Sequence, residues 1–283
     1  KWTWWKDLEN DVARTVMSWI DAIVFALVAV YFFNNFFFQN YQIPSSSLEK
    51  TLMTGDFLLV SKISYGPRVP QTPLTMPLTQ HTLPVFNCKS YIEWPQWEYR
   101  RVPGLGKVEY GDIVVFNYPA GDTVAVDFNG DYYSLCYELG CNAAYEQGIE
   151  VPMMHTLDRE QQQDQFNYFY SVGKQIVAAN ANVYGQVMTR PADRRENYVK
   201  RCVGLPGQTL QIKDKIIYVD GKKQDTPTFA QFNYKVYTRN NQVLSDDLCD
   251  ELNVSDEDRD KILDHNEGIP LTKMAVDMLR KNT

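Results

Sequence analysis

The feature that most constrains this chain is an apolar segment close to its N-terminus. The residues from Ala22 to Phe33 are all apolar or aromatic, and Phe36–Phe38 continue the segment after a pair of asparagines. A helix from Trp19 to Phe38 is about 30 Å long at ~1.5 Å per residue, which matches the hydrocarbon core of a bilayer. We therefore predict a transmembrane helix over residues 17–40.

Two other interpretations of this segment are a cleaved secretory signal and the buried core helix of a soluble protein. The apolar run is longer than the core of a usual signal sequence, and Gln39–Gln42 offers no pair of small residues for cleavage. Four tryptophans at or before the start of this segment are typical of membrane interfaces: Trp2, Trp4, Trp5 and Trp19. The sequence favours a membrane anchor over both alternatives.

The distribution of positive charge predicts how the chain is oriented. Lys1, Lys6 and Arg14 precede the apolar segment, and no further Lys or Arg occurs before Lys50. By the positive-inside rule, residues 1–16 form a cytoplasmic juxtamembrane segment and residues 41–283 lie outside. The chain begins with lysine, so an upstream segment with further spans is left open.

Composition excludes some classes of function. The 283 residues carry a net charge of −7, which argues against general nucleic-acid binding. The three histidines are far apart and lack the spacing of metal ligands, so neither a zinc site nor a Ser-His-Asp triad is supported by the sequence, although spacing alone does not exclude a triad. Of the five cysteines, Cys136 and Cys141 are close enough in sequence for a disulfide in an oxidising compartment, or they are buried thiols.

The part beyond the apolar segment is predicted to consist mostly of strands and loops. Residues 66–85 are predicted to be an extended loop, and residues 120–196 a more helical insertion, especially over 159–171 and 172–181. Residues 244–263 are acidic and predicted to be solvated, and 271–280 is predicted to be an amphipathic helix. Predicted strands, with a tight turn at Asp220-Gly221, are 56–64, 111–118, 198–203, 209–212 and 215–219.

Three serines follow the apolar segment, and a lysine lies in a short apolar stretch much later in the chain. The serines are Ser45, Ser46 and Ser47, and the lysine is Lys200. A serine hydroxyl is a weak nucleophile until a base removes its proton, and a neutral lysine can be that base. Burial among apolar residues favours the neutral amine. The pattern predicts a serine–lysine pair at the membrane surface.

The segments that contain these residues resemble the type I signal peptidases. The stretch from Ile43-Pro44 through Ser47-Leu48 to Gly55-Asp56 is similar to the nucleophile box of that family. Residues 57–66 resemble the strand that continues this box, residues 111–119 the next box, and residues 198–207 the lysine box. These segments occur in the family's order behind a membrane span and cover about a fifth of the chain, outside the insertions at 67–110 and 120–196.

The resemblance implies a role for each matching residue. Ser47 matches the nucleophile and Lys200 the general base, while the Ser45 hydroxyl and the Ser47 backbone N–H match the oxyanion hole. Other positions match the shallow pockets that accept small substrate side chains: Tyr41, Ile43, Pro44, Leu48, Leu52, Tyr198 and Val199.

The resemblance also implies an architecture and a location. The expected fold is mainly β, a signal-peptidase-like antiparallel β catalytic domain with a mixed α/β insertion at 120–196, anchored by an N-terminal transmembrane helix. The expected partners are preprotein signal peptides, the lipid bilayer and components of the secretion translocon. The expected location is the bacterial inner membrane, with the catalytic domain on the periplasmic face and no cofactor.

Two departures from the family pattern, and two other functions, remain open. Lys50 stands where the family has proline, and the family's Gly-Asp-Asn-Arg box, which is absent here, is expected beyond Thr283. Ser47-Leu-Glu-Lys50 is also an S-x-x-K motif of penicillin-binding-type acyltransferases, although the partner motifs S-x-N and K-T-G are missing. The third interpretation is a non-catalytic, membrane-tethered β module that binds secretion partners.

Overall fold

A computed structural model describes residues 3–83, 85–86, 88–119, 121–128, 130–237, 244–255, 258–259 and 268–281. The chain divides into two compact units that both draw on distant parts of the sequence. The first unit comprises Lys1–Gln39, Ser61–Gly106 and Val115–Val199, and the second comprises Asn40–Val60, Lys107–Val114 and Lys200–Thr283.

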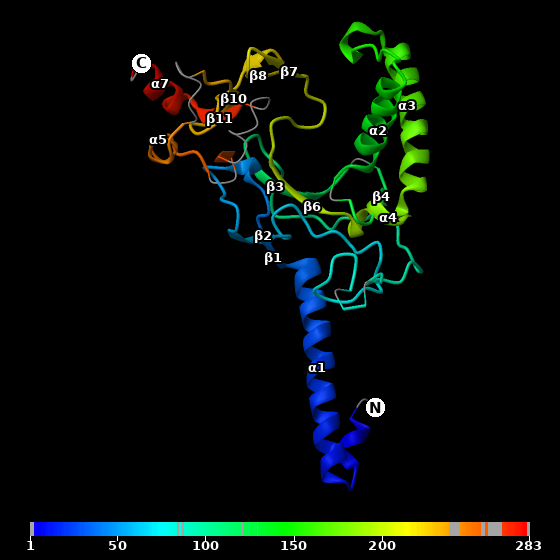
Figure 1. Cartoon of the computed structure of the whole chain (residues 1–283). Helices are drawn as coiled ribbons and strands as arrows, with labels where there is room; N and C mark the ends of the chain where they lie inside the picture. Colours follow the sequence, from blue (N-terminus) through cyan, green and yellow to red (C-terminus); the bar gives the residue numbers. More distant parts are fainter. Residues whose placement is uncertain are drawn as a thin grey trace. The chain divides into compact units, whose positions relative to one another are not determined.

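The first unit begins with the long apolar helix α1 (Asp11–Phe36), which projects from the rest of the unit (Figure 1). The Asn10 side chain caps the helix by accepting hydrogen bonds from the backbone N–H groups of Val12 and Ala13. The helix is long and apolar enough to cross a membrane, and its most apolar window is entirely unburied. It starts before the predicted span of 17–40, because capping fixes its first turn, and it ends at Phe36, just before strand β1.

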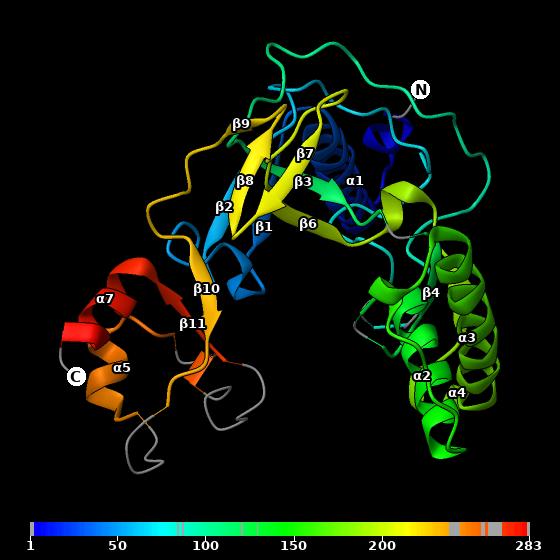
Figure 2. The same ribbon diagram turned by 90° about the horizontal axis from the view of Figure 1, so that it is seen from above.

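The insertion at 120–196 forms a helical hairpin in the first unit. Helices α2 (Tyr132–Glu146) and α3 (Arg159–Ala179) lie side by side (Figure 2). Two glycines allow this close approach, since a Cβ on Gly173 would lie 1.7 Å from the Cys136 carbonyl oxygen and one on Gly140 would lie 2.0 Å from that of Phe169. The short helix α4 (Ala181–Tyr184) follows α3, and strand β4 (Thr123–Ala125) pairs antiparallel with β5 (Val187–Thr189).

The hairpin decides between the two interpretations of the cysteine pair. Cys136 and Cys141 both lie on α2, where residues five apart point in different directions around the helix. Cys136 packs with Ala125, Tyr132 and Val177, whereas Cys141 belongs to a separate cluster. Both are buried free thiols in the structure.

The remaining strands form small sheets. β1 pairs with β2, β3 with β6, and β10 with β11, while β7, β8 and β9 form a three-stranded sheet (Figure 2). The β8–β9 turn is at Asp220-Gly221, as predicted, with both residues at positive φ. The bounds are β1 (Phe38–Gln42), β2 (Phe57–Ser61), β3 (Ile113–Asn117), β6 (Asn197–Arg201), β7 (Leu210–Lys213), β8 (Ile216–Val219), β9 (Lys222–Lys223), β10 (Gln231–Tyr234) and β11 (Ile269–Thr272).

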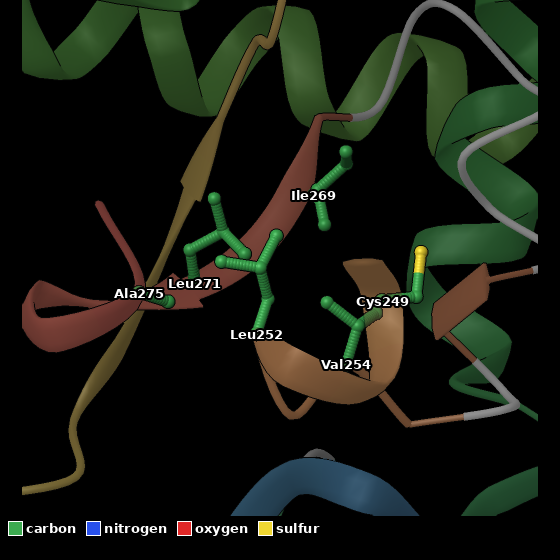
Figure 3. Packing of buried hydrophobic residues seen from close by; sticks show 6 residues of the cluster. All are labelled: Cys249, Leu252, Val254, Ile269, Leu271 and Ala275. Carbon is green, nitrogen blue, oxygen red and sulfur yellow. The ribbon is translucent and has the colours of Figure 1, made fainter. Parts of the chain in front are cut away.

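The second unit has its own apolar core near the end of the chain. Helices α5 (Asp246–Glu251) and α7 (Lys273–Lys281) pack with β11, and α7 confirms the predicted helix at 271–280 to within a few residues. The predicted solvated acidic surface at 244–263 falls partly outside the described residues. In its described part the prediction is wrong for Cys249, Leu252 and Val254, which are buried because α5 and the residues that follow it pack their apolar side chains into this core. Figure 3 shows the buried side chains of this core: Cys249, Leu252, Val254, Ile269, Leu271 and Ala275.

The prediction of a mainly β chain is wrong for the part of the chain that the structure describes. Helices contain more of these residues than strands do, because α1, α2 and α3 are long and every strand has at most five residues. Strand patterns recur often along the sequence, but each pattern is short. The architecture is an apolar N-terminal helix followed by several small antiparallel sheets and a helical insertion.

Candidate active site

The three serines lie in a loop of the second unit, and backbone hydrogen bonds join the two ends of this loop. The Ile43 N–H donates to the Asp56 carbonyl oxygen at 2.9 Å, and the Gly55 N–H donates back to the Ile43 carbonyl oxygen at 2.9 Å. The Asp56 carboxylate accepts a hydrogen bond from the Met53 N–H at 2.8 Å, which stabilises the turn before β2. The loop therefore starts and ends at one fixed point of the backbone, with Ile43 buried beneath it.

Ser47 lies in a short 3₁₀ turn, Ser46–Leu48, within this loop. The turn is continued by hydrogen bonds from the Thr51 and Leu52 N–H groups to the Leu48 carbonyl oxygen, at 3.0 and 2.9 Å. Ser47 is exposed, so its hydroxyl is open to an incoming molecule.

Lys200 approaches Ser47 from strand β6. Its amine Nζ donates a hydrogen bond to the Ser47 hydroxyl oxygen, although the two residues are 153 positions apart in sequence. Lys200 is partly buried, whereas Ser47 is exposed. The structure thus brings together, within one unit, the two residues that the sequence singled out for a nucleophile and a base.

Arg201 ties the end of β6 to the serine loop. Its guanidinium donates to the Thr51 hydroxyl at 3.2 Å and to the Gly111 carbonyl oxygen at 3.1 Å. Backbone hydrogen bonds between Cys202 and the Gly111-Asp112 turn, at 2.7 and 2.8 Å, hold the same region. No role was predicted for Arg201 from the sequence, because nothing local to either segment signals its contact with Thr51.

Lys50, the other candidate base, has a different partner. Its amine donates to the Asn253 carbonyl oxygen at 2.5 Å and lies 3.9 Å from the Glu49 carboxylate. No hydrogen bond joins it to Ser47, although both residues are described. Lys50 has a φ of 67°, so its backbone turns back at this point of the loop.

Asn253 is able to accept this bond because of how helix α5 ends. Asn253 follows the helix with a φ of 54°, and its N–H donates to the Asp250 carbonyl oxygen. The Val254 N–H donates to the Cys249 carbonyl oxygen, which completes a Schellman motif. The Asn253 carbonyl oxygen accepts the hydrogen bond from the Lys50 amine.

Ser45 and five of the seven predicted pocket residues are close to Ser47 in the sequence and belong to the second unit. Ser45 has an extended backbone and is exposed, and its side chain does not cap the following turn. Among the predicted pocket residues of this unit, Pro44 is exposed and Ile43 is buried. The others, Tyr41, Leu48 and Leu52, are partly buried.

Tyr198 and Val199 directly precede Lys200 on β6 but belong to the first unit. Within that unit the Tyr198 ring packs against Tyr118, with 4.6 Å between ring centroids. Tyr198 also lines a pocket of about 200 Å³ in the first unit, together with Arg190 and Glu196. Among the described residues, no group of three or more His, Cys, Asp and Glu side chains is arranged to hold a metal ion.

Comparisons with known proteins point to one family. A family model described as "Signal peptidase, peptidase S26" matches residues 16–267. The chain is 41% identical over 51 residues to signal peptidase IB of Staphylococcus aureus, a match that covers 18% of this chain and 26% of that protein. It is 44% identical over 45 residues to signal peptidase I of Bacillus caldolyticus, covering 16% and 25% of the two chains. The chain therefore aligns with about a quarter of the length of these relatives, and no solved structure matches it significantly.

Proposed function

The chain belongs to the signal peptidase family, peptidase S26, and on this premise we propose that it is a membrane-anchored serine endopeptidase that removes signal peptides from exported proteins. The observation that carries the proposal is the hydrogen bond between Lys200 and Ser47. Ser47 is the proposed nucleophile and Lys200 the proposed general base.

The first step is attack of the Ser47 oxygen on the carbonyl carbon of the scissile peptide bond. When the Lys200 amine is neutral, its lone pair accepts the hydroxyl proton along the line of the existing hydrogen bond. The resulting ammonium group then gives that proton to the leaving amine as the peptide bond breaks. Water attacks the acyl-enzyme in the second half of the reaction, and Lys200 serves again as base.

Negative charge that develops on the carbonyl oxygen needs hydrogen-bond donors. We assign these to the Ser47 backbone N–H and the Ser45 hydroxyl, which lies two residues earlier and does not cap the intervening turn. Removal of one such donor typically costs about 3–4 kcal/mol of transition-state stabilisation. Ser45→Ala is therefore expected to lower kcat by about 10²–10³-fold while Ser47→Ala abolishes acylation.

The proposed substrates are preproteins with small side chains before the cleaved bond. Loop residues of the second unit (Tyr41, Ile43, Pro44, Leu48 and Leu52) and the strand residues Tyr198 and Val199 are the proposed contacts. Small side chains suit shallow pockets and agree with the small-x-small pattern of secretory cleavage sites. We place the catalytic region on the periplasmic face of the bacterial inner membrane, beside the secretion translocon, since positive charge precedes α1.

The test uses the purified full-length chain in detergent with a preprotein substrate. Lys200→Met is expected to lower kcat/KM by about 10³-fold or more, since it removes the general base and keeps the length of the side chain. Lys50→Met is the matched control, and it is expected to retain cleavage. If Lys50→Met abolished acylation of Ser47 and Lys200→Met did not, the S-x-x-K mechanism would replace this one. If the unmodified chain cleaved no preprotein, the non-catalytic binding module would remain.

A further inference from the structure

A group of four cations in the first unit has no role in the proposed reaction. Two of its members, Arg68 and Arg101, face each other across an isolated antiparallel bridge. Backbone hydrogen bonds of 2.9 Å on either side of them, from Val69 to Arg100 and from Val102 to Pro67, fix this pairing. Like charges directly opposite each other are destabilising unless something compensates them. The basic cluster consists of Lys62, Arg68, Arg101 and Arg194.

Lys62 is partly buried, and the charges of the other three cations act on its amine. Its amine makes no hydrogen bond or ion pair with any residue in the described part of the chain. Burial, followed by the nearby charges of Arg68, Arg101 and Arg194, lowers the pKa of Lys62 to about 8. Three guanidinium charges therefore act on the Lys62 amine in addition to its burial.

Asp193 provides the acidic charge that acts on the cluster, and its carboxylate is already engaged. One carboxylate oxygen accepts hydrogen bonds from both the N–H and the hydroxyl of Thr72, each at 2.9 Å, and lies 3.4 Å from the Arg194 guanidinium. Arg194 is only 7% exposed, and its Nε is buried without a hydrogen-bond partner among the described residues.

Among the described residues, the Asp193 carboxylate acts on Arg68 and pairs with Arg194. The other partners printed for the guanidinium groups of Arg68 and Arg101 are neutral: Arg68 donates to the Asn117 side chain at 2.7 Å, and Arg101 donates to the Gly66 carbonyl oxygen and the Tyr99 hydroxyl at 2.7 and 3.0 Å. The positive charge of the cluster therefore exceeds the negative charge placed beside it.

The cluster lies at the end of α1 where the helix leaves the membrane. The Lys62 N–H donates to the Phe37 carbonyl oxygen at 2.8 Å, and the Tyr31 hydroxyl donates to the Pro73 carbonyl oxygen at 2.8 Å. Figure 1 shows the 61–106 segment, in cyan, beside the C-terminal end of α1. With the hydrocarbon core over Trp19–Phe38, α1 ends close to the boundary between the core and the headgroup layer.

The segment that contains Arg101 also exposes aromatic rings. Trp94, Trp97 and Tyr99 are 81%, 50% and 60% exposed. Exposed Trp and Tyr side chains are typical of membrane interfaces. Lipid phosphates occupy the same layer, so an anion is available where the cluster needs one.

We propose that the basic cluster binds the phosphate group of an anionic lipid headgroup at the membrane-proximal end of the first unit. The guanidinium groups of Arg68 and Arg101 suit phosphate oxygens, and Lys62 adds a point charge between them. This site is independent of Ser47 and Lys200, and it gives the insertion at 67–110 a role in membrane contact.

The test measures the melting temperature and lipid retention of the full-length chain in a neutral detergent. Dihexanoyl-phosphatidylglycerol, dihexanoyl-phosphatidylcholine and inorganic phosphate are added at equal concentrations. We expect phosphatidylglycerol to raise the melting temperature by several degrees and to be retained in native mass spectrometry. Lys62→Met and Arg68→Gln are expected to remove both effects. Lys62→Met relieves repulsion and is expected to fold normally, whereas Arg68→Gln also loses the hydrogen bond to the Asn117 side chain, so its melting temperature without lipid is measured first.

The matched control is Arg100→Gln, an exposed arginine next to Arg101 that alternates to the opposite side of the extended chain. It is expected to keep the full response. An equal response to phosphatidylcholine, or an equal loss in Arg100→Gln, would overturn the site in favour of general membrane or surface-charge effects. A full response to inorganic phosphate would overturn the lipid as the ligand and leave a site for free phosphate.

Discussion

Lys62 provides a test at the scale of one residue. Its pKa of about 8 in the folded chain lies below the ordinary 10.5, so the folded state disfavours the charged amine. Below pH 8 the amine is charged in both the folded and the unfolded state. The unfavourable surroundings of the charged amine then lower the free energy of unfolding by about 3 kcal/mol. Between about pH 8 and 10.5 the unfolded chain binds more protons, so stability rises with pH over this window.

We expect Lys62→Met to be more stable than the parent chain at pH 7 in the absence of anionic lipid, and the difference to vanish toward pH 10.5. Thermal unfolding followed by tryptophan fluorescence at pH 7, 9 and 10.5 measures it. Lys174→Met, which removes an exposed lysine of the same unit, should show no such change. A constant difference between Lys62→Met and the parent chain across this range would contradict the depressed pKa.

Lys50 provides a second residue-scale test, because it joins the serine loop to the end of α5. A hydrogen bond with one charged partner contributes about 1.5–3 kcal/mol, and partial exposure places this one at the lower end. Lys50→Ala is expected to lower kcat/KM by a few-fold and to destabilise the second unit by about 1–2 kcal/mol. Parallel measurements of preprotein cleavage and thermal unfolding test this, and unchanged stability would show that the bond contributes nothing.

The α2–α3 hairpin is the element most sensitive to a single methyl group. A Cβ at position 173 would collide with the backbone of Cys136, and backbone cannot move aside as a flexible side chain can. Gly173→Ala is therefore expected to separate the helices and to lower the melting temperature of the chain by several degrees. Lys174→Ala, at the next and exposed position of α3, is the control, and an equal effect of both variants would rule out the close approach as the cause.

The accuracy of the sequence-based prediction also differs between kinds of element. Strands β2, β3, β6, β7 and β8 occur where apolar periodicity and turn residues placed them, because both signals are local. α3 is one helix where two segments were predicted, and α2 gave little signal because only one of its buried residues, Leu135, is a large aliphatic side chain. The Ser47–Lys200 pair was expected from the family resemblance, whereas the Lys50–Asn253 contact spans 203 positions and leaves no trace in either segment.

For the whole molecule, the proposed orientation predicts which cysteine a reagent can reach. Cys88 is exposed, Cys136, Cys141 and Cys249 are buried, and Cys202 is intermediate. A membrane-impermeant maleimide should label the chain in intact spheroplasts, and Cys88→Ser should remove most of the label. Labelling that required lysis of the spheroplasts would reverse the orientation.

The short connection between α1 and the serine loop limits where this chain can act. Ser47 follows the last residue of α1, Phe36, by only eleven positions, and a fully extended chain gains at most about 3.6 Å per residue. The hydroxyl therefore cannot travel farther than about 40 Å from the point at which the helix ends. A substrate peptide bond beyond that distance cannot be attacked, however well the neighbouring substrate side chains fit the pockets. The length of this connection therefore limits the position of cleavage independently of side-chain recognition.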